Sequence, residues 1–410
     1  MTNKLHVRKG RFAITCFGRS LLGLALAGFL FSANAGVLPE DRADALYFRY
    51  DGGGVVIDGP SVLVRKSIGE HVSVSANHYI DMVSSASIDV ETSASPYVDE
   101  RTQSSLSVDF LHGKSMYTLG YVNSDESDYL AKTMFAGISH DMFGDLTTIS
   151  FGYKRGENEV FRNLKDPNTG VVANDPNFAE TMETQSFNVS ISQIITKNLV
   201  VTGQYEVITD EGFLRSPYRS YRFFTPDLTS QGLLPEQYPN TRSSNAGSFR
   251  AKYFLPYRAA IDTMYRFYTD TWGILGHTAE LGYVHPLGKW IFEARARYYT
   301  QEAADFYQDI FPRANYANFM ARDKELATYS AVTAGLGATY EFKIERFPWL
   351  AKGSLNLRYD FMTVAYDDFR DATFSIGSFG TPPANPLPPG QEPLYELEAN
   401  IIQFYISAFF

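Results

Sequence analysis

The chain has 410 residues, of which 44% are hydrophobic and 15% aromatic, with 27 Tyr and 31 Phe. Its 36 Lys and Arg are outnumbered by 46 Asp and Glu, and a formal net charge of −10 argues against nucleic acid as a partner. A single cysteine excludes a disulfide framework within the chain.

The first 35 residues have the three parts of a secretory signal peptide. A basic region without acidic residues extends to Arg19, an apolar run covers residues 21–31, and a small-residue stretch ends at Ala35 before Gly36. A membrane anchor, the alternative, is excluded because this run is too short for a hydrocarbon core that needs about 20 residues. We expect cleavage between Ala35 and Gly36, which leaves residues 36–410 as a single domain.

The composition of the mature chain is that of an outer-membrane protein. Cleavage removes Cys16 and five basic residues, which leaves no thiol for a disulfide or a metal, and 31 Lys and Arg against 46 Asp and Glu. No later apolar run approaches the length of a transmembrane helix. An exported, acidic, tyrosine-rich chain of this kind is typical of an outer-membrane β-barrel, where aromatic side chains form belts at both interfaces.

Short and long connections alternate along the mature chain. The short ones carry glycine, proline or a polar pair and lie at residues 68–70, 112–114, 143–145, 196–198, 255–258 and 287–289. The long ones are polar and lie at residues 84–102, 156–181, 210–245, 302–325 and 367–393. This alternation is typical of a barrel with short periplasmic turns and long outer loops, and a soluble β-sandwich has no reason to adopt it.

The segments between these connections alternate apolar and polar residues, as strands with two different faces do. Trp290 and Phe292, for example, alternate with Glu293 and Arg295. A dry sandwich core could not accept such charges, whereas a wet lumen can. We expect the apolar set to face lipid and the following residues to face the lumen: Asp81, Asp109, Glu206, Asp262, Arg266, Glu280, Glu293, Arg295, Arg297, Arg358 and Asp360.

Fifteen such segments follow residue 61, and residues 46–50 supply a sixteenth. The number should be even because both termini of such a barrel lie in the periplasm. The sequence therefore predicts an all-β, antiparallel up-and-down transmembrane barrel of about sixteen strands, with fourteen as the alternative, in the outer membrane of a Gram-negative bacterium. Too few residues separate Ala35 from the first strand to form a globular plug.

The last stretch of the chain has the pattern of a closing strand. One register of it, formed by Ile402, Phe404, Ile406, Ala408 and Phe410, is wholly apolar, and the chain ends on an aromatic residue. We expect this face to contact outer-membrane lipid, and the barrel-assembly machinery to be a partner during insertion.

The connection at residues 302–325 differs from the other long loops in its large apolar side chains. Phe306, Tyr307, Ile310 and Phe311 would expose a patch that monomeric surfaces rarely tolerate. We expect this loop to fold inward, to pack these four side chains on the barrel wall and to narrow the lumen. A helical turn is compatible with the spacing of Phe306 and Ile310, and the charged residues 322–325 should mark the return of the chain to solvent.

The sequence offers no catalytic, cofactor-binding or metal-binding residue. Glycines 52–54 are followed by neither a Gly-Lys-Ser/Thr sequence nor a helix pattern, which favours a hairpin turn over a phosphate loop. The acidic pairs at 210–211 and 367–368 lack the spacing of a calcium loop. No Ser, His and acid form a recognisable constellation, so we expect no enzyme.

Several stretches resemble a proteobacterial outer-membrane family catalogued only as a domain of unknown function. They are residues 49–54, 58–66, 205–212, 238–242 and 320–326, and the resemblance extends over nearly the whole mature chain. It implies a barrel. The genes of this family often lie near those for a flavin-attaching transferase, a thioredoxin-like protein and a small lipoprotein, which suggests periplasmic redox proteins or that lipoprotein as partners.

Two functions are compatible with these observations. The first is a channel or porin-like conduit for small polar solutes, in which the lumen charges either act as a selectivity device or only pair with one another to stabilise the wall. The second is a structural sheath or assembly partner of an extracytoplasmic redox system.

Overall fold

The computed structural model describes residues 36–85, 92, 97–165, 172–228, 230–343, 350–378 and 380–410. The expected signal peptide, with Ala35 at its end, lies outside the described residues. Gly36 is the first described residue.

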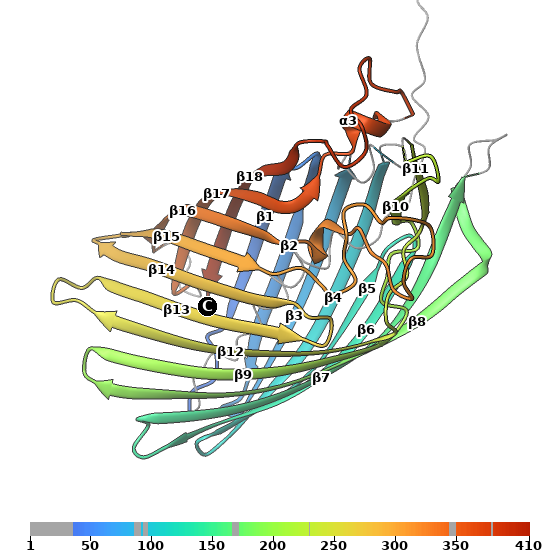
Figure 1. The fold of residues 1–410 in the computed structure, drawn as a ribbon. Coiled ribbons are helices and arrows are strands. Elements are labelled where there is room, and N and C mark those ends of the chain that lie inside the picture. Colours follow the sequence, from blue (N-terminus) through green and yellow to red (C-terminus); the bar gives the residue numbers. More distant parts are fainter. Residues whose placement is uncertain are drawn as a thin grey trace, which may run out of the picture.

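Sixteen strands of the described chain form one closed antiparallel barrel, which confirms the expected number and excludes fourteen (Figure 1). Each strand pairs with its neighbour in the chain, in an up-and-down order. The wall strands are β1 (Arg42–Gly52), β2 (Val55–Ile68), β3 (Val72–Ser85), β4 (Tyr97–His112), β5 (Ser115–Asp125), β6 (Tyr129–Met142), β7 (Thr147–Lys165), β8 (Val172–Thr196), β9 (Leu199–Gly212), β12 (Thr241–Phe254), β13 (Ala260–Asp270), β14 (Leu275–Leu287), β15 (Trp290–Gln301), β16 (Tyr329–Phe342), β17 (Lys352–Arg370) and β18 (Leu394–Phe409).

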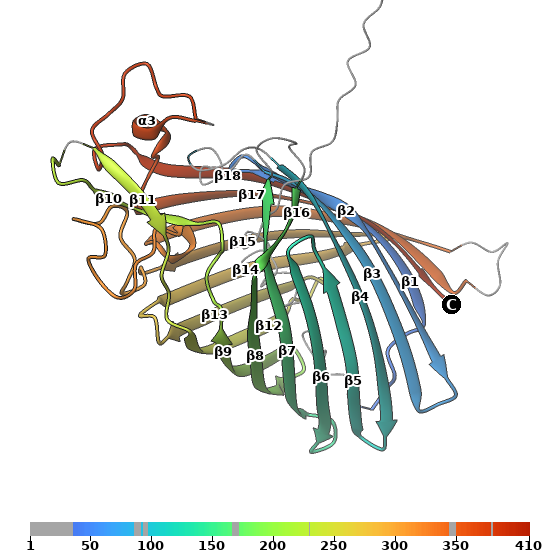
Figure 2. The ribbon, with the colours of Figure 1, turned by 90° about the vertical axis from the view of Figure 1, so that its right-hand side faces the viewer.

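The barrel closes where the first strand meets the last. β1 and β18 pair from Arg42 with Phe409 to Gly52 with Ala399. Phe410 extends this contact, because its backbone N–H donates to the carbonyl of Asp41 at 3.2 Å. The C-terminus and the start of β1 therefore lie at the same end of the barrel, the end of the short turns, which we call the turn end (Figure 2).

The two faces of each strand differ as the alternation predicts. On β18, Ile402, Phe404 and Ile406 are exposed on the outside at 40%, 41% and 42%, and Ala408 shares their face. The intervening residues, such as Gln403, face inward, where Gln403 pairs with Phe48 of β1 and Arg358 of β17. The register also places all eleven predicted lumen residues on the inner face.

The long connections differ from expectation in one respect. Most of residues 156–181 are strand, because β7 and β8 continue as a hairpin beyond their neighbours. Polar residues lie on both faces of this extension, so its sequence lacks the apolar alternation of a strand in lipid.

At the opposite end, the loop end, three long connections gather with two small elements. A separate hairpin of β10 (Ser220–Phe224) and β11 (Gln231–Pro235) lies within the connection from β9 to β12. A single helical turn, α3 (Thr373–Ile376), follows β17, and a 3-10 turn, Lys324–Leu326, precedes β16. Figures 1 and 2 both show these elements together at the loop end. Among the described residues, no helix has the length and apolar character needed to cross a membrane.

The outward position of the closing strand yields a prediction. Changing Phe404 and Ile406 together to Asp should prevent insertion, because a charge on the lipid face costs roughly 2–4 kcal/mol for Lys or Arg at mid-depth and less for Asp. Heat-modifiable migration in gels measures the folded barrel. Gln403→Asp is the matched control, since its carboxylate would face the lumen beside Arg358. A double variant that still migrates as a folded barrel would contradict the face assignment.

Candidate functional site

The lumen wall carries two different kinds of polar surface. On β3 and β4, Asp109 bonds to Arg65 and accepts a hydrogen bond from Thr118 Oγ1 at 2.7 Å. Asp81 lies nearer the loop end, with its Oδ2 3.9 Å from Nη1 of Arg101. Both carboxylates are buried between neighbouring side chains and not exposed to the lumen.

Hydroxyl groups dominate this half of the wall. Glu206 of β9, the third predicted acid here, accepts a hydrogen bond from Ser186 Oγ at 3.1 Å. The buried inward residues of β3 to β8 include Ser73, Ser75, Ser107, Ser139, Ser150 and Ser186. This half of the lumen therefore presents mostly neutral polar groups.

The wall from β12 to β17 is ionic instead. Asp262 accepts a hydrogen bond from Arg250 Nε at 2.8 Å, and its other oxygen lies 3.5 Å from Lys252 Nζ. Glu280 lies 3.5 Å from Arg297 Nε and 3.8 Å from Arg250 Nη2. Each of these carboxylates is thus shared by two basic side chains.

Asp360 and Arg295 meet across an intervening strand. They lie on β17 and β15, and Gly335 of β16 is paired with both. A side chain at Gly335 would collide with the Asp360 carboxylate, so glycine leaves the space in which the two groups bond. Arg295 Nε donates to Asp360 Oδ1 at 2.6 Å, and Arg358 Nε lies 3.7 Å from Oδ2.

Arg266 and Glu293 complete the predicted set, and neither forms an ion pair with the residues that the structure describes. The Arg266 guanidinium lies 5.6 Å from the ring centre of Tyr268. Glu293 is paired with Gly337, which is paired in turn with Arg358. The ionic wall therefore contains both shared and unshared charges.

Three connections fill the loop end, and we call their described residues the mouth plug: residues 213–240, 302–328 and 371–393. One continuous apolar cluster joins the first two to the wall. Its wall members include Tyr50 of β1 and Met182 of β8, strands that lie on opposite sides of the closed ring. Other members come from β18, β17 and the turn between β13 and β14, so the cluster extends around this part of the rim.

Phe306 and Tyr307 belong to this cluster. The Phe306 ring lies 5.2 Å from that of Trp272 and 5.4 Å from that of Tyr238, between ring centres. Tyr307 is buried, and its hydroxyl donates to the carbonyl of Asp368 at 3.2 Å, beside the end of β17.

Ile310 and Phe311 contact other loops instead, so the expectation that all four pack on the barrel wall is wrong for these two. The Phe311 ring lies 5.3 Å from that of Tyr221 on β10, in a second small cluster with Met320. Ile310 lies beside Gly390. The helical turn with which the spacing of Phe306 and Ile310 is compatible does not form, since residues 306–310 contain a turn, a single bridge and bends.

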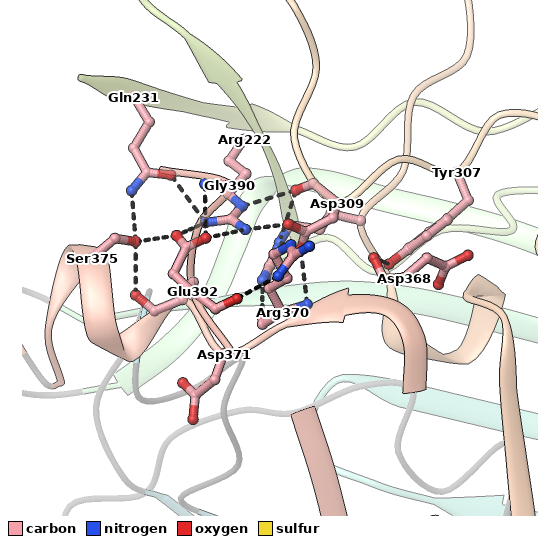
Figure 3. Close-up of polar contacts among 12 residues, drawn as sticks. Arg222, Gln231, Tyr307, Asp309, Asp368, Arg370, Asp371, Ser375, Gly390 and Glu392 are labelled. Carbon is pink, nitrogen blue, oxygen red and sulfur yellow. Dashed lines mark hydrogen bonds and ion pairs between the residues drawn. The ribbon is translucent and has the colours of Figure 1, made fainter. Parts of the chain in front are cut away.

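A buried arginine holds the three segments of the plug together. Arg222 of β10 is fully buried and bonds to the carboxylates of Asp309 and Glu392, one from each of the other two segments (Figure 3). Its Nε also donates to the carbonyl of Asp309 at 2.9 Å. Ser375 Oγ donates to Glu392 at 2.5 Å, and the Gly390 N–H does so at 2.7 Å. We call Arg222, Asp309 and Glu392 the latch.

Pairing favours the charged forms of Arg222 and Glu392. Burial by itself lowers the pKa of Arg222, but Asp309 and Glu392 hold that pKa above its ordinary value. Burial likewise raises the pKa of Glu392, but hydrogen bonds from Arg222 and Ser375 leave that pKa below its ordinary value.

Residues 322–324 are buried, so the expectation that residues 322–325 return to solvent is wrong for them. Arg322 Nε donates to the Asp309 carbonyl at 3.1 Å, and its Nη2 donates to the carbonyl of Arg370 at 2.7 Å. Asp323 pairs with Arg219 and accepts a hydrogen bond from Tyr238 Oη at 3.3 Å. This second set of ion pairs lies beside the latch.

Tyr218 ties the plug to the wall near β5 to β7. Its hydroxyl donates to Asp128 Oδ2 at 2.7 Å and accepts a hydrogen bond from the Asn163 N–H at 2.7 Å. Asp128 lies in the short connection between β5 and β6 and is fully buried, and its Oδ1 has no hydrogen-bond partner among the described groups. Burial raises the pKa of Asp128 to about 8, and the nearby carboxylates of Asp99 and Glu126 act in the same direction.

The three latch residues were not predicted from the sequence, and neither were Asp128 and Tyr218. The signal available was the mixture of Arg215, Arg219 and Arg222 with aromatic residues in one long loop. Within the described residues, no group of three or more His, Cys, Asp or Glu could hold a metal ion.

Comparisons with known proteins bear on the whole chain. The profile of a family described as "Protein of unknown function (DUF3570)" matches residues 85–361. A search of curated proteins found no match. Solved structures with a similar fold include a bacterial polysaccharide outer membrane secretin, at 7% identity, TM-score 0.46, and coverage of 91% of this chain and 100% of that one.

Two structures from Pseudomonas aeruginosa are also similar. A FadL homologue has 9% identity and a TM-score of 0.41, with 91% of each chain covered. The outer membrane protein opdK has 10% identity and a TM-score of 0.40, with coverage of 91% of this chain and 100% of that one.

The contact between Asp128 and Tyr218 predicts a pH dependence. The folded pKa of about 8 is above the ordinary value, so the folded state binds this proton more tightly than the unfolded chain does. The stability that the group contributes is complete below about pH 4 and is lost as pH rises to 8. Hydrogen exchange of residues 213–219, corrected for intrinsic rates, should therefore show weaker protection at pH 8.5 than at pH 5.

Asp128→Asn should remove most of this difference, because the amide stays neutral at both pH values. Asp227→Asn is the matched control and should retain the difference between the two pH values, because Asp227 is an exposed acid in the same plug segment as Tyr218. An equal pH dependence in both variants would show that Asp128 does not carry the effect.

Proposed function

The chain belongs to the family described as Protein of unknown function (DUF3570), and we propose that it is a gated outer-membrane conduit for small polar solutes. The mouth plug, held by the latch, is the closed gate. The single observation that carries the proposal is that a lumen lined with exposed charged side chains ends at a mouth where the chain's own loops bond to one another and pack on the wall.

The exposure of charged side chains in the lumen is the first support. Arg250, Lys252 and Arg295 keep 42%, 49% and 41% of their side-chain surface exposed although they face the inside of the barrel. A protein-filled lumen would need to pair and bury such groups. A hydrated path for polar solutes therefore fits this half of the wall.

The structure of the plug is the second support. Its three segments are separate connections that bond to one another through Arg222, Asp309 and Glu392. Breaking a buried ion pair by removing one partner costs about 3–5 kcal/mol. Because the three segments contribute one partner each, movement of any one of them would break the latch.

The orientation follows from the same proposal. The loop end would face the outside, and the turn end, with both described termini, would lie in the periplasm. A solute bound for the cell would meet the plug first and the ionic wall second.

A second function has one observation in its favour. Arg222 and Glu392 of the latch are fully buried, Asp309 is 11% exposed, and all three are paired, as expected for a mouth that never opens. A non-conducting barrel of that kind would suit a structural sheath or assembly partner for periplasmic redox proteins or a small lipoprotein. Co-purification of such a partner from native membranes, together with an absence of conductance, would favour this function.

Planar-bilayer conductance tests the gate. Arg222→Met should raise single-channel conductance several-fold, because Glu392 would lose its basic partner in a buried site and Asp309 would keep only Arg322 of its two. Removal of residues 304–321 should have the same effect by a different route. Heat-modifiable migration must show that both barrels are folded.

Arg313→Met is the matched control, since Arg313 is exposed and, among the described residues, its side chain contacts the backbone carbonyls of Ala314 and Asn315, at 3.4 and 3.3 Å, and the ring of Tyr316 but no carboxylate. It should conduct like the parent protein. Folded Arg222→Met and deletion variants with the parent's conductance would contradict the proposed gate.

A further inference from the structure

The charged side chains of the ionic wall differ in how far they are exposed to the lumen. We call its six inward basic residues the basic stripe: Arg250, Lys252, Arg266, Arg295, Arg297 and Arg358. They come from β12, β13, β15 and β17, four of the six consecutive wall strands from β12 to β17.

Two acids of this wall lie behind their basic partners, whereas Glu280 is as exposed as Arg297, at 33% against 30%. Asp360 is 1% exposed, whereas its partners Arg295 and Arg358 are 41% and 31% exposed. Asp262 is 20% exposed, against 42% for Arg250, with which it pairs. At Asp360 and Asp262, lumen water therefore meets guanidinium and ammonium groups first and carboxylates second.

The stripe also carries an excess of positive charge. Four acids share its wall, namely Asp262, Glu280, Glu293 and Asp360, so six basic groups exceed them by two. Arg242 and Asp270, closer to the mouth, pair with each other, and Glu341 and Lys352, at the turn end, carry one charge of each sign, so this balance is unchanged. The excess is notable in a chain with a formal net charge of −10.

Two members of the stripe flank one strand. Arg266 of β13 is paired with Thr278 of β14, and Arg297 of β15 is paired with Glu280 of β14. Thr278 and Glu280 are successive inward residues, so the backbones of Arg266 and Arg297 are roughly 12 Å apart from strand spacing and rise. Two arginine side chains can reach a small molecule between them.

We propose that the basic stripe binds small carboxylate anions, held between Arg266 and Arg297, and makes the conduit anion-selective. This rests on the proposed conduit and names its substrate class. Arg266 is available because no carboxylate of the described chain pairs with it. Arg297 shares the single acid Glu280 with Arg250.

The chemistry of the guanidinium groups sets which anions the stripe prefers and the distance over which it attracts them. A guanidinium presents two parallel N–H groups that match the two oxygens of a carboxylate. At physiological ionic strength the Debye length is about 8 Å, so the stripe acts on ions close to it and not across the whole lumen. Selectivity must therefore come from contact with the wall.

Protection from an arginine reagent tests binding without requiring an open gate. The purified barrel is treated with phenylglyoxal, and modification is followed by mass spectrometry with succinate, 1,4-butanediol or putrescine present. Succinate should slow modification of Arg266 and Arg297 several-fold, and the neutral and cationic four-carbon controls should not. Arg313, exposed in the mouth plug, should react at the same rate in all three.

Ion selectivity is the second measurement. In the Arg222→Met background, the reversal potential in a KCl gradient should shift toward cation selectivity when Arg266 and Arg297 are both changed to Gln. Lys154→Gln removes a charge from the inner face of β7, in the opposite half of the wall, and should shift it less. Equal reversal potentials in the two variants would overturn the assignment.

The outcomes separate the two proposals. Conductance without succinate protection of Arg266 and Arg297 overturns the anion site and leaves the conduit standing. Succinate protection in a folded barrel that never conducts supports the anion site and overturns the conduit.

Discussion

The pairing of β1 with β18 is the constraint on which the rest of the molecule depends. A strand in lipid has no water to satisfy its backbone N–H and C=O groups, so the sheet must close on itself. Closure separates a lipid face from a lumen, and the two-residue period of each strand then assigns every side chain to one of them. The contact between Phe410 and Asp41 extends this closure, since the backbone N–H of Phe410 donates to the carbonyl of Asp41, the residue directly before β1.

The barrel could be predicted from the sequence because its signals are local. The apolar register from Ile402 to Phe410 and the alternation from Trp290 to Tyr298 each specify a strand and its faces within ten residues. The same alternation placed the lumen charges, because a one-residue shift would have moved every one of them to lipid. The hairpin extension of β7 and β8 was missed for the converse reason: beyond the lipid neither face needs to be apolar, and a polar strand resembles a loop.

The mouth plug could not be predicted, because its contacts join distant parts of the chain. Arg222 is 170 residues from Glu392 and 87 from Asp309. Arg322 and Asp323 were expected in solvent because an isolated buried charge is prohibitively costly. That cost is met only by a complete set of partners, and no local pattern shows that Arg219, Glu236 and Asp309 come to the same place. The apolar content of residues 302–325 indicated burial, but not which surface would cover each side chain.

The two kinds of contact in the plug have different consequences for opening. The apolar cluster of Phe306 and Tyr307 joins the loop to the wall, and separating it would expose hydrocarbon to water at about 25 cal/mol per Å² with no compensation. The latch joins the loops to one another, and its ions regain hydration once water enters, which offsets much of the lost attraction. The plug should therefore separate most easily along a plane through Arg222 and its two carboxylates. The apolar cluster would keep residues 302–328 on the wall. Opening along that plane adds Arg222 and its two carboxylates to the path above the basic stripe, so a passing solute would meet charged side chains in the mouth as well as in the lumen.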